Sequence, residues 1–393
     1  MYMDISFYEV ILPKLRKLAS EISEPAYKRY EEIVSKLWRT ITIDEKYPKL
    51  VYGIDGGSRV VEFKGFVFSL VTAIAVGYVY EDSVYRLKES LRTAYVGKIV
   101  PLSNIGERIK LYREIVEGKV ACHACKDGAM ILMDGSIASI IVRPRPEPRF
   151  TQRYFLIEDV VGYINSKDKA YFKKLKECID STLVDKNKLV ETPICSADLK
   201  PHGIESEELD IVAVIVEYIE KLYTYGKLIE QAIRGSCQLV FIAKTSHSRD
   251  LVNSPLYPDI ILFEKLTNGK GISSSIFKQL IEYKNLPRPD LPEEYLNVFE
   301  YYSLAGLLYS YMRLEDRGPM LKVEVIGDYS NLHDSRDKTL LEVYRSLQAI
   351  SNNGYPHPLR IAHRDTHITY NDMKKLLHLL GLDIESTGRE VLE

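Results

Sequence analysis

The chain has 393 residues, of which 46% are hydrophobic, so it can form one large domain or two ordinary ones with a sizeable core. Its 53 basic and 55 acidic residues give a net charge of −2 at pH 7, which excludes a general electrostatic preference for nucleic acid or membrane surfaces. A binding site for a polyanion would therefore have to be a local patch.

Targeting signals and cysteine usage indicate the compartment. No apolar run reaches the ~18 residues of a membrane-spanning helix, and residues 1–4 (MYMD) lack the basic and apolar regions of a signal peptide. Five cysteines, an odd number in a long chain, argue against a secreted disulfide scaffold. We therefore expect a cytoplasmic protein with no membrane partner. Glutamine is scarce, with five residues in the chain, and this favours a thermophilic source.

Cys122 and Cys125 form a CxxC motif with the sequence CHAC. A structural zinc site would need further ligands, and no second CxxC follows among the other cysteines. The pattern therefore favours plain thiols or a local hairpin disulfide over a zinc site.

Apolar periodicity predicts the elements of the first half in chain order. Helical spacing over residues 5–38 predicts an N-terminal helical segment, which we assign to residues 1–45. A short buried strand is predicted at 51–55, and residues 60–80 suit two further strands that form a meander with it. The remaining elements of this half are a strand within 84–100, a helix at 103–117 and a short central strand at 129–133.

The second half alternates between helical and strand patterns. Residues 155–235 are predicted to be mostly helical, with 209–233 as the longest helix. The later elements are strands at 238–243 and 321–326 and helices at 337–351, 358–367 and 371–380. We therefore predict an α/β fold in which one compact domain, residues 46–393, carries a helical insertion at about 155–235.

Two motifs of the same shape are the most informative feature of the chain. Residues 52–58 (YGIDGGS) and 131–136 (ILMDGS) are apolar runs that end in Asp-Gly and a serine. If each run is a buried strand, Asp55 and Asp134 are delivered to one edge of the sheet, where the two carboxylates repel each other unless a cation lies between them. A divalent metal ion is the usual solution. The alternative is an ordinary turn, because Asp-Gly is also a common hairpin signal.

Two further ligands are predicted from their position in the chain. Glu114 lies on the helix between the two aspartates, beside the apolar stripe; Glu107 is one heptad earlier on much the same face and stays an alternative. His363 lies on a helix near the C-terminus, with Asp365 as the rival ligand on a different face. Three acids and a histidine suit two hard cations, Mn²⁺ or Mg²⁺, in a site that hydrolyses phosphodiesters.

Basic and aromatic residues near these positions could hold a nucleic-acid backbone. Lys244 ends a predicted strand and could contact a phosphate; its alternative is a solvated loop residue. A Pro-spaced basic loop follows the Asp134 strand, with an aromatic pair beside it that could stack on bases. The residues concerned are Arg143, Arg145, Arg149, Arg153, Tyr154 and Phe155.

In order and spacing these motifs resemble the NurA family of archaeal nucleases. The matching segments are 52–58 (YGIDGGS), 113–114 (RE), 132–136 (LMDGS), 243–246 (AKTS), and 354–356 (GYP) leading to 362–363 (AH). The resemblance implies an RNase H-like mixed sheet flanked by helices, related to the slicer domain of Argonaute. It also implies Asp55, Glu114, Asp134 and His363 as ligands of two metal ions, with Mn²⁺ preferred.

The same resemblance implies an activity and partners. It implies 5′→3′ exonuclease action on single- and double-stranded DNA, and endonuclease action on single strands, in the resection of DNA ends for homologous recombination. It further implies a homodimer that docks on a hexameric HerA translocase. The CxxC motif and the length of the 155–235 insertion are not matched by this resemblance, so their roles stay open.

Two other functions fit part of the pattern. An actin- or hexokinase-like phosphotransferase also uses strand-borne Asp-Gly motifs, and it predicts nucleotide binding; against it, no second glycine-rich phosphate loop follows Asp134. A non-catalytic adaptor that binds only DNA or a partner ring predicts that the four candidate ligands do not converge.

Overall fold

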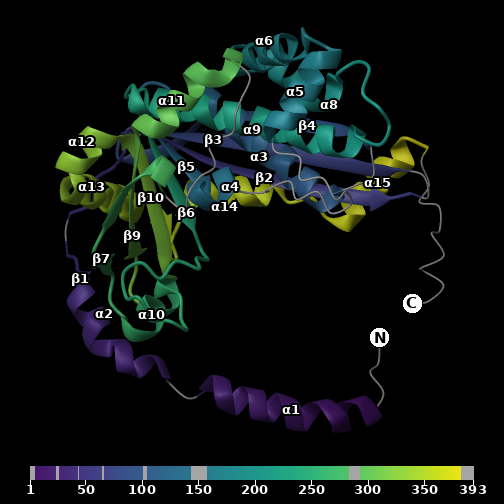
Figure 1. Cartoon of the computed structure of the whole chain (residues 1–393). Helices are drawn as coiled ribbons and strands as arrows, with labels where there is room; N and C mark the ends of the chain where they lie inside the picture. Colours follow the sequence, from purple (N-terminus) through teal and green to yellow (C-terminus); the bar gives the residue numbers. More distant parts are fainter. Residues whose placement is uncertain are drawn as a thin grey trace.

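The computed structural model describes residues 5–23, 26–42, 44–63, 66–100, 104–142, 157–282 and 293–381. Within these ranges ten strands form one mixed sheet, flanked by helices on both faces (Figure 1). The sheet order is β1-β7-β9-β10-β6-β5-β2-β3-β4, with β8 paired to β9. The β2–β5 and β5–β6 pairs are parallel, and the other pairs are antiparallel. The predicted α/β class with a helix-flanked mixed sheet is therefore confirmed.

The strands differ greatly in length. Those of the sheet are β1 Trp38–Thr40, β2 Leu50–Glu62, β3 Val67–Glu81, β4 Val84–Ile99, β5 Ala129–Asp134, β6 Cys237–Ala243, β7 Gly271–Ser273, β8 Ile276–Gln279, β9 Ala305–Arg313 and β10 Leu321–Asp328. A small separate hairpin joins β11 Ser351–Asn352 to β12 Tyr355–Pro356. The antiparallel β2–β3–β4 strands form the largest continuous surface of the sheet.

Helices cover the sheet and build the insertion. Their bounds are α1 Ile5–Ser23, α2 Glu31–Leu37, α3 Ile105–Ala124, α4 Ile137–Val142, α5 Ile157–Lys167, α6 Tyr171–Val184, α7 Lys186–Glu191, α8 Cys195–Asp198, α9 Leu209–Ile233, α10 Asp259–Leu266, α11 Leu296–Leu304, α12 Tyr329–Asp334, α13 Arg336–Ala349, α14 His357–Thr366 and α15 Tyr370–Leu379. No helix within the described ranges is long and apolar enough to cross a membrane.

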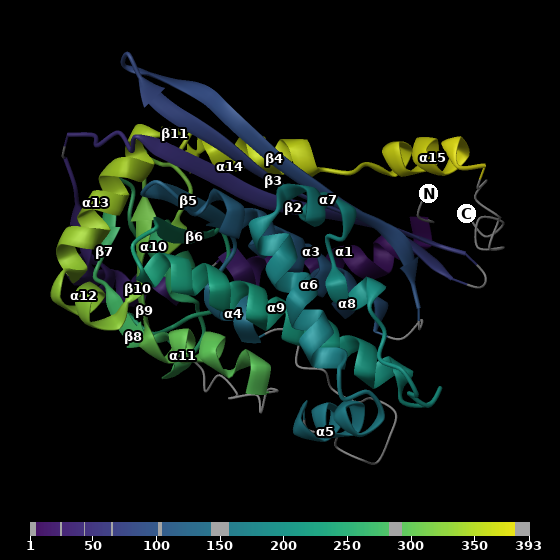
Figure 2. The same cartoon turned by 90° about the horizontal axis from the view of Figure 1, so that it is seen from above.

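Two hydrophobic cores lie on opposite faces of the sheet (Figure 2). On one face α3 and α9 pack against the strands through Ile115, Val116 and Leu222. On the other face α13 and α14 cover the strands, with Val343 and Leu359 in the second core. The helices α5 to α9 stand between β5 and β6 in the chain and form a further core with α11. The site described below lies where these two layers meet the ends of β5 and β6.

Buried ion pairs join α3 to α9, the longest helix of the insertion. Arg108 contacts Glu217 at 2.6 Å, and Lys119 contacts Glu220 at 2.7 Å, with all four side chains almost completely buried. Charges so far from water are tolerated only when they are paired and hydrogen-bonded. These pairs therefore fix how α3 is rotated and displaced along α9.

The first hairpin departs from the sequence prediction. The strand expected at 51–55 continues as β2 to Glu62, so Asp55 lies inside a strand and not at its end. The stretch 60–80, for which two strands were predicted, contains the end of β2 and the single strand β3. The sequence prediction made Asp55 the last strand residue before Gly56 and Gly57, whereas Gly53, Gly56 and Gly57 all lie inside β2.

Close approach of α14 explains two of these glycines. A Cβ atom at Gly53 would overlap the backbone carbonyl of Pro358, and one at Gly57 would overlap the carbonyl oxygen of Thr366. The helix backbone therefore rests directly on β2, which only glycine allows. This packing places α14, and every side chain it carries, at a fixed height above β2.

We expect Gly53→Ala to lower the free energy of unfolding by about 1–3 kcal/mol, the range for overpacking of a well-packed contact. The added methyl group has no room unless α14 moves away from β2. Gly162→Ala in α5 is the matched control, because a Cβ there meets nothing within 4 Å and alanine favours the helix. Thermal unfolding should show opposite shifts; a Gly53→Ala protein as stable as the wild type would contradict this packing.

The cysteines do not pair as the CxxC motif suggested. Cys122 is a buried free thiol, and Cys125 is bonded to Cys237 at the start of β6. A second disulfide joins Cys178 to Cys195 within the insertion. The local hairpin disulfide is therefore wrong, because Cys122 lies inside the helix α3 and Cys125, at the end of that helix, pairs with the first residue of β6 instead.

Candidate active site

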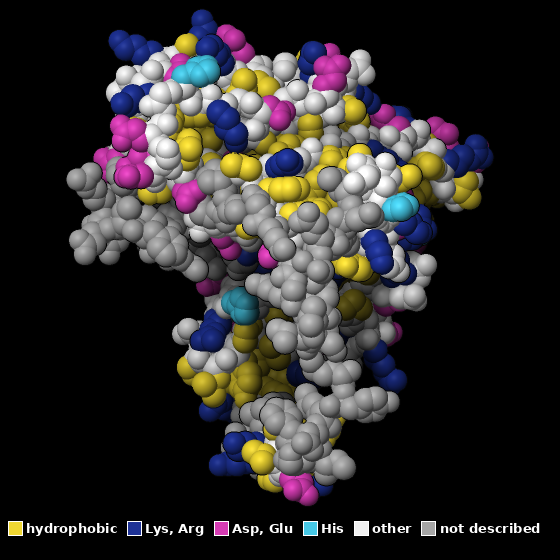
Figure 3. All heavy atoms as spheres, turned by 90° about the vertical axis from the view of Figure 1, so that its right-hand side faces the viewer, with side chains coloured by type: hydrophobic (Ala, Val, Ile, Leu, Met, Phe, Trp, Pro, Cys, Tyr) yellow, Lys and Arg dark blue, Asp and Glu magenta, His cyan; other side chains and the backbone are white. Residues whose placement is uncertain are grey.

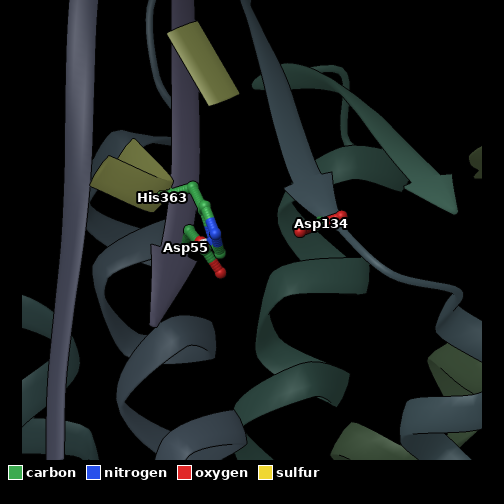
Figure 4. Close-up of side chains that lie close together, drawn as sticks. All are labelled: Asp55, Asp134 and His363. Carbon is green, nitrogen blue, oxygen red and sulfur yellow. Dashed lines mark hydrogen bonds and ion pairs between the residues drawn. The ribbon is translucent and has the colours of Figure 1, made fainter. Parts of the chain in front are cut away.

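Three polar side chains from distant parts of the chain meet at one point. Asp55 on β2, Asp134 at the end of β5 and His363 on α14 each offer one ligand atom, and these three atoms all lie within 4.8 Å of one another (Figure 4). The Nδ1 atom of His363 lies 2.7 Å from Oδ2 of Asp55. Three of the four predicted ligands are thus brought together.

Strand register places the two aspartates side by side. In the parallel β2–β5 pair, Ile54 is opposite Met133, so the next residue on each strand is an aspartate. Both carboxylates point to the face of the sheet that carries α14, because Gly53 and Gly57, two positions from Asp55, face that helix. The close approach of α14 then brings His363 over Asp55.

Electrostatics favour a cation between the aspartates. Burial raises the pKa of Asp55, and the nearby Asp134 carboxylate raises it further, whereas the hydrogen bond with His363 and one from the Gly56 amide lower it. The Asp55 side chain is only 9% exposed. Two carboxylates close together in a poorly solvated site repel each other, and a divalent cation would relieve both the repulsion and the burial penalty.

The three side chains line a cavity of about 610 Å³. It opens where β5 and β6 end while β2 continues past them. One wall is acidic and comprises the two aspartates and two glutamates of α3. The lining also includes cations and hydroxyl groups, from residues 244–248, Lys322 and Arg113, and Lys244 contacts Asp134 directly.

The glutamates of α3 occupy different places. Glu114 lines the cavity, but its Oε2 atom lies 3.1 Å from Nζ of Lys221, a buried lysine of α9. Glu117 lies closer to β2, since a Cβ at Gly56 would be only 2.5 Å from its Oε1 atom. Burial raises the pKa of Glu117 well above its ordinary value; Arg113 opposes this shift, and Asp55, Glu114 and Asp134 add to it. Sequence reasoning missed Glu117.

The two alternative ligands lie elsewhere. Glu107 is exposed and forms an ion pair with Lys110 at 2.9 Å. Asp365 contacts Arg92 of β4 at 3.2 Å, away from the Asp55 carboxylate. Neither lines the cavity.

Lys244 and Tyr355 close the site around Asp134. The Nζ atom of Lys244 lies 3.3 Å from Oδ2 of Asp134 and 4.6 Å from the centre of the Tyr355 ring. The Tyr355 hydroxyl donates to Oδ1 of Asp134 over 3.4 Å. Tyr355 has no assigned role in the sequence analysis, although it lies in the GYP segment that contributes to the family resemblance. The other predicted DNA contacts, Arg143, Arg145, Arg149, Arg153 and Tyr154, lie outside the described residues.

Charge on the face shown in Figure 3 is mixed. Described Lys and Arg side chains are interspersed with Asp and Glu over the upper part of this face, in keeping with the near-neutral net charge. This face therefore shows no single large basic patch among the described residues.

Comparison with known proteins assigns the family. Residues 49–368 match the NurA domain, which is most of the chain and includes every residue of the converging cluster. The chain belongs to the NurA family.

Similarity to NurA proteins extends over nearly the whole chain. The DNA double-strand break repair nuclease NurA of Saccharolobus solfataricus is 24% identical over 383 residues, which cover 95% of this chain and 94% of that protein. The crystal structure of the NurA nuclease from Sulfolobus solfataricus superposes with a TM-score of 0.67 at 21% identity, covering 96% of this chain and 97% of that one. A structure of NurA bound to dAMP and manganese gives a TM-score of 0.65 at 18% identity, with coverage of 96% and 97%. The NurA fold is therefore shared.

Glu117→Gln should change the stability of the metal-free protein and its stabilisation by Mn²⁺ in opposite directions. A folded-state pKa raised above the unfolded value of 4.5 means that ionisation of Glu117 destabilises the fold as the pH rises above that value. Gln cannot ionise, so the metal-free variant should melt at a higher temperature than the wild type at pH 8, with the difference shrinking below pH 4.5. Stabilisation by added Mn²⁺ should instead be smaller in the variant.

Glu114→Gln is the matched comparison for that experiment. It breaks the ion pair with buried Lys221, so its metal-free protein should melt at a lower temperature than the wild type. If Glu117→Gln also lowered the melting temperature at pH 8, the burial penalty assigned to Glu117 would be wrong.

Proposed function

We propose that this protein is a Mn²⁺-dependent DNA nuclease that acts in the repair of DNA double-strand breaks. The convergence of Asp55, Asp134 and His363 within 4.8 Å, on the wall of an open cavity, is the observation that carries the proposal. Membership of a family whose curated relatives are named DNA double-strand break repair nucleases supports it. The related NurA structure that holds dAMP and manganese agrees with the proposed metal and substrate class.

The donor set fits a hard divalent cation. Two carboxylates and one imidazole nitrogen are typical ligands of Mn²⁺, and Mg²⁺ would accept the carboxylates. We propose that Asp55, Asp134 and His363 hold two such ions together with a carboxylate of α3. Glu114, the residue predicted from the sequence, contacts Lys221, and Glu117 contacts Arg113 at 3.5 Å; we favour Glu117 because it lies closer to β2. A bound cation would supply the positive charge that activates water and stabilises the leaving oxygen of a phosphodiester.

The remaining residues of the cavity would bind and orient the DNA. Lys244 can exchange its contact with Asp134 for a phosphate oxygen, because half of its side chain is exposed. The Ser246 hydroxyl lines the same cavity and can donate to a further phosphate oxygen, whereas the Ser248 hydroxyl already donates to Asp250. The Tyr355 hydroxyl, hydrogen-bonded to Asp134, restrains that carboxylate while the substrate binds.

We further propose an RNase H-like core in the domain 46–393, preceded by the N-terminal helical segment. The strand order β4-β3-β2-β5-β6, with two antiparallel pairs followed by two parallel ones, supports this core. The finer activities follow the family resemblance: 5′→3′ exonuclease action on single- and double-stranded DNA, endonuclease action on single strands, and end resection for homologous recombination. The proposed setting is the cytoplasm, as a homodimer that docks on a HerA hexamer.

The geometry disfavours the adaptor, and nucleotide binding tests the phosphotransferase. An adaptor without catalysis predicts that the candidate ligands are spread apart, whereas three of them converge. A phosphotransferase predicts nucleotide binding, which a rise in melting temperature with Mg-ATP would reveal.

A nuclease assay tests the proposal directly. Purified protein should degrade single- and double-stranded DNA labelled at the 5′ or the 3′ end in the presence of Mn²⁺, and chelation with EDTA should stop the reaction. Release of the 5′ label first would establish the proposed polarity. Intact DNA after incubation with Mn²⁺, Mg²⁺ and Co²⁺, by a protein that remains folded, would refute the nuclease assignment.

A further inference from the structure

A buried glutamate outside the metal cluster holds the turn that follows Asp134. Glu324 of β10 is fully buried, and its two carboxylate oxygens accept hydrogen bonds from different atoms of this turn. The Ser136 hydroxyl donates to Oε1 over 2.8 Å, and the Ile137 backbone amide donates to Oε2 over 2.8 Å. Hydrogen bonds to a charged acceptor are about twice as strong as neutral ones. Ser136 is the serine of the second Asp-Gly-Ser motif, to which the metal cluster assigns no role.

Few other contacts hold the turn between Asp134 and Ile137 in place. Gly135 has φ of +105°, a conformation that only glycine adopts readily, and its amide donates to the Ile242 carbonyl over 2.9 Å. Asp134 is the last residue of β5, so the strand ladder fixes the chain before it. Glu324 fixes the chain after it. The direction of the Asp134 side chain therefore depends on both anchors.

Lys322 balances the charge of Glu324. Its Nζ atom lies 2.6 Å from Oε1 of Glu324 and 4.1 Å from the centre of the Tyr309 ring, and its side chain is only 3% exposed. Tyr309 in turn hydrogen-bonds Asp250, which also accepts from the Ser248 hydroxyl in the loop after β6. The pair on β10 thus connects the segments that follow β5 and β6, and both segments contribute to the lining of the cavity.

We infer that Glu324 is a positioning residue: with Lys322 beside it, it holds the Gly135–Ser136 turn so that the Asp134 carboxylate faces Asp55 and His363 at the distance a shared cation needs. This inference rests on the proposed metal-dependent function. The carboxylate does not touch the metal cluster itself; it acts through two hydrogen bonds to the segment that carries a ligand. Removal of groups that orient metal ligands typically weakens metal affinity by about 10- to 100-fold.

Glu324→Gln tests the inference, with Mn²⁺ affinity measured by the electron paramagnetic resonance of free Mn²⁺. We expect the dissociation constant to rise about tenfold, with kcat largely recovered at saturating Mn²⁺. In the metal-free protein, hydrogen exchange at residues 135–137 should be faster than in the wild type. Asp259→Asn is the matched control, because Asp259 is an equally buried carboxylate that accepts two backbone hydrogen bonds, from Leu251 and Val252, but holds a segment that carries no proposed metal ligand. It should lower stability and leave the dissociation constant unchanged.

Ser136→Ala is the milder variant, since it removes one of the two hydrogen bonds and keeps the charge pair with Lys322 intact. It should raise the dissociation constant for Mn²⁺ by a smaller factor than Glu324→Gln. The inference is overturned if both variants bind Mn²⁺ like the wild type, or if Asp259→Asn weakens binding as much as Glu324→Gln does. Absence of Mn²⁺ binding by the wild type would refute the proposed function instead. Hydrogen exchange in the metal-free protein tests the inference independently of Mn²⁺ binding. If exchange at residues 135–137 is unchanged in Glu324→Gln, Glu324 does not hold the turn.

Discussion

Asp55→Asn is expected to lower the rate of Mn²⁺-dependent DNA cleavage by at least about 10³-fold, because loss of a metal's charge stabilisation removes several kcal/mol and each 1.4 kcal/mol is about tenfold. Asp55 lies beside Asp134 and contacts His363 directly, so it joins the other two converging groups. Asn keeps the size of the side chain but removes the charge that balances a divalent cation. The measurement is single-turnover cleavage of labelled single-stranded DNA at saturating Mn²⁺.

The variant should remain folded, which separates this loss from unfolding. Burial and the neighbouring Asp134 raise the pKa of Asp55, so a neutral amide removes an unfavourable charge from the metal-free protein. Its melting temperature without metal should therefore be no lower than that of the wild type. Asp365→Asn is the matched control, because Asp365 lies on the same helix as His363 but contacts Arg92. Cleavage at the wild-type rate by Asp55→Asn would refute the metal site.

Sequence patterns predicted the cluster because its geometry follows from strand register. Two apolar runs that each end in Asp-Gly become adjacent parallel strands, and register then sets Asp55 beside Asp134. The error concerned where β2 ends. The prediction ended the strand at Asp55, whereas β2 continues to Glu62 and α14, from the distant C-terminal part of the chain, rests on Gly53 and Gly57 within it. Local propensity cannot report a packing partner about 300 residues away.

Local sequence patterns also cannot decide which glutamate of α3 serves as a ligand, because contacts from other elements affect that choice. Periodicity placed Glu114 beside the apolar stripe, and the structure does place it on the cavity wall. The two glutamates differ in their partners: Lys221 reaches Glu114 from the helical insertion, whereas Glu117 contacts Arg113 of its own helix. A helix wheel shows which residues share a face, but it does not show which of them a buried lysine from another element will neutralise.

The disulfide between Cys125 and Cys237 should contribute more to stability than the one between Cys178 and Cys195. The first closes a loop with a sequence separation of 112 residues, which contains β5 and the whole helical insertion, and the second closes one of 17 residues. In the chain-entropy treatment, loops of about 100 and about 15 residues correspond to about 4.7 and about 3 kcal/mol. We therefore expect Cys125→Ala/Cys237→Ala to lower the melting temperature more than Cys178→Ala/Cys195→Ala, measured on oxidised proteins.

Cleavage should survive removal of the long-range bond, and this distinguishes a stabilising role from a catalytic one. Cys237 is opposite Ala129 in the β5–β6 register and Asp134 is opposite Ile242, so the bond lies at the far end of these strands, about 16 Å from the site at about 3.3 Å per residue. The α3 helix that carries Glu117 is also held by its buried ion pairs with α9, which do not depend on the disulfide. Well below its melting temperature, Cys125→Ala/Cys237→Ala should cleave DNA and bind Mn²⁺ like the wild type. A loss of Mn²⁺ affinity in the folded variant would instead mean that the bond sets the spacing of β5 and β6, and with it the position of Asp134.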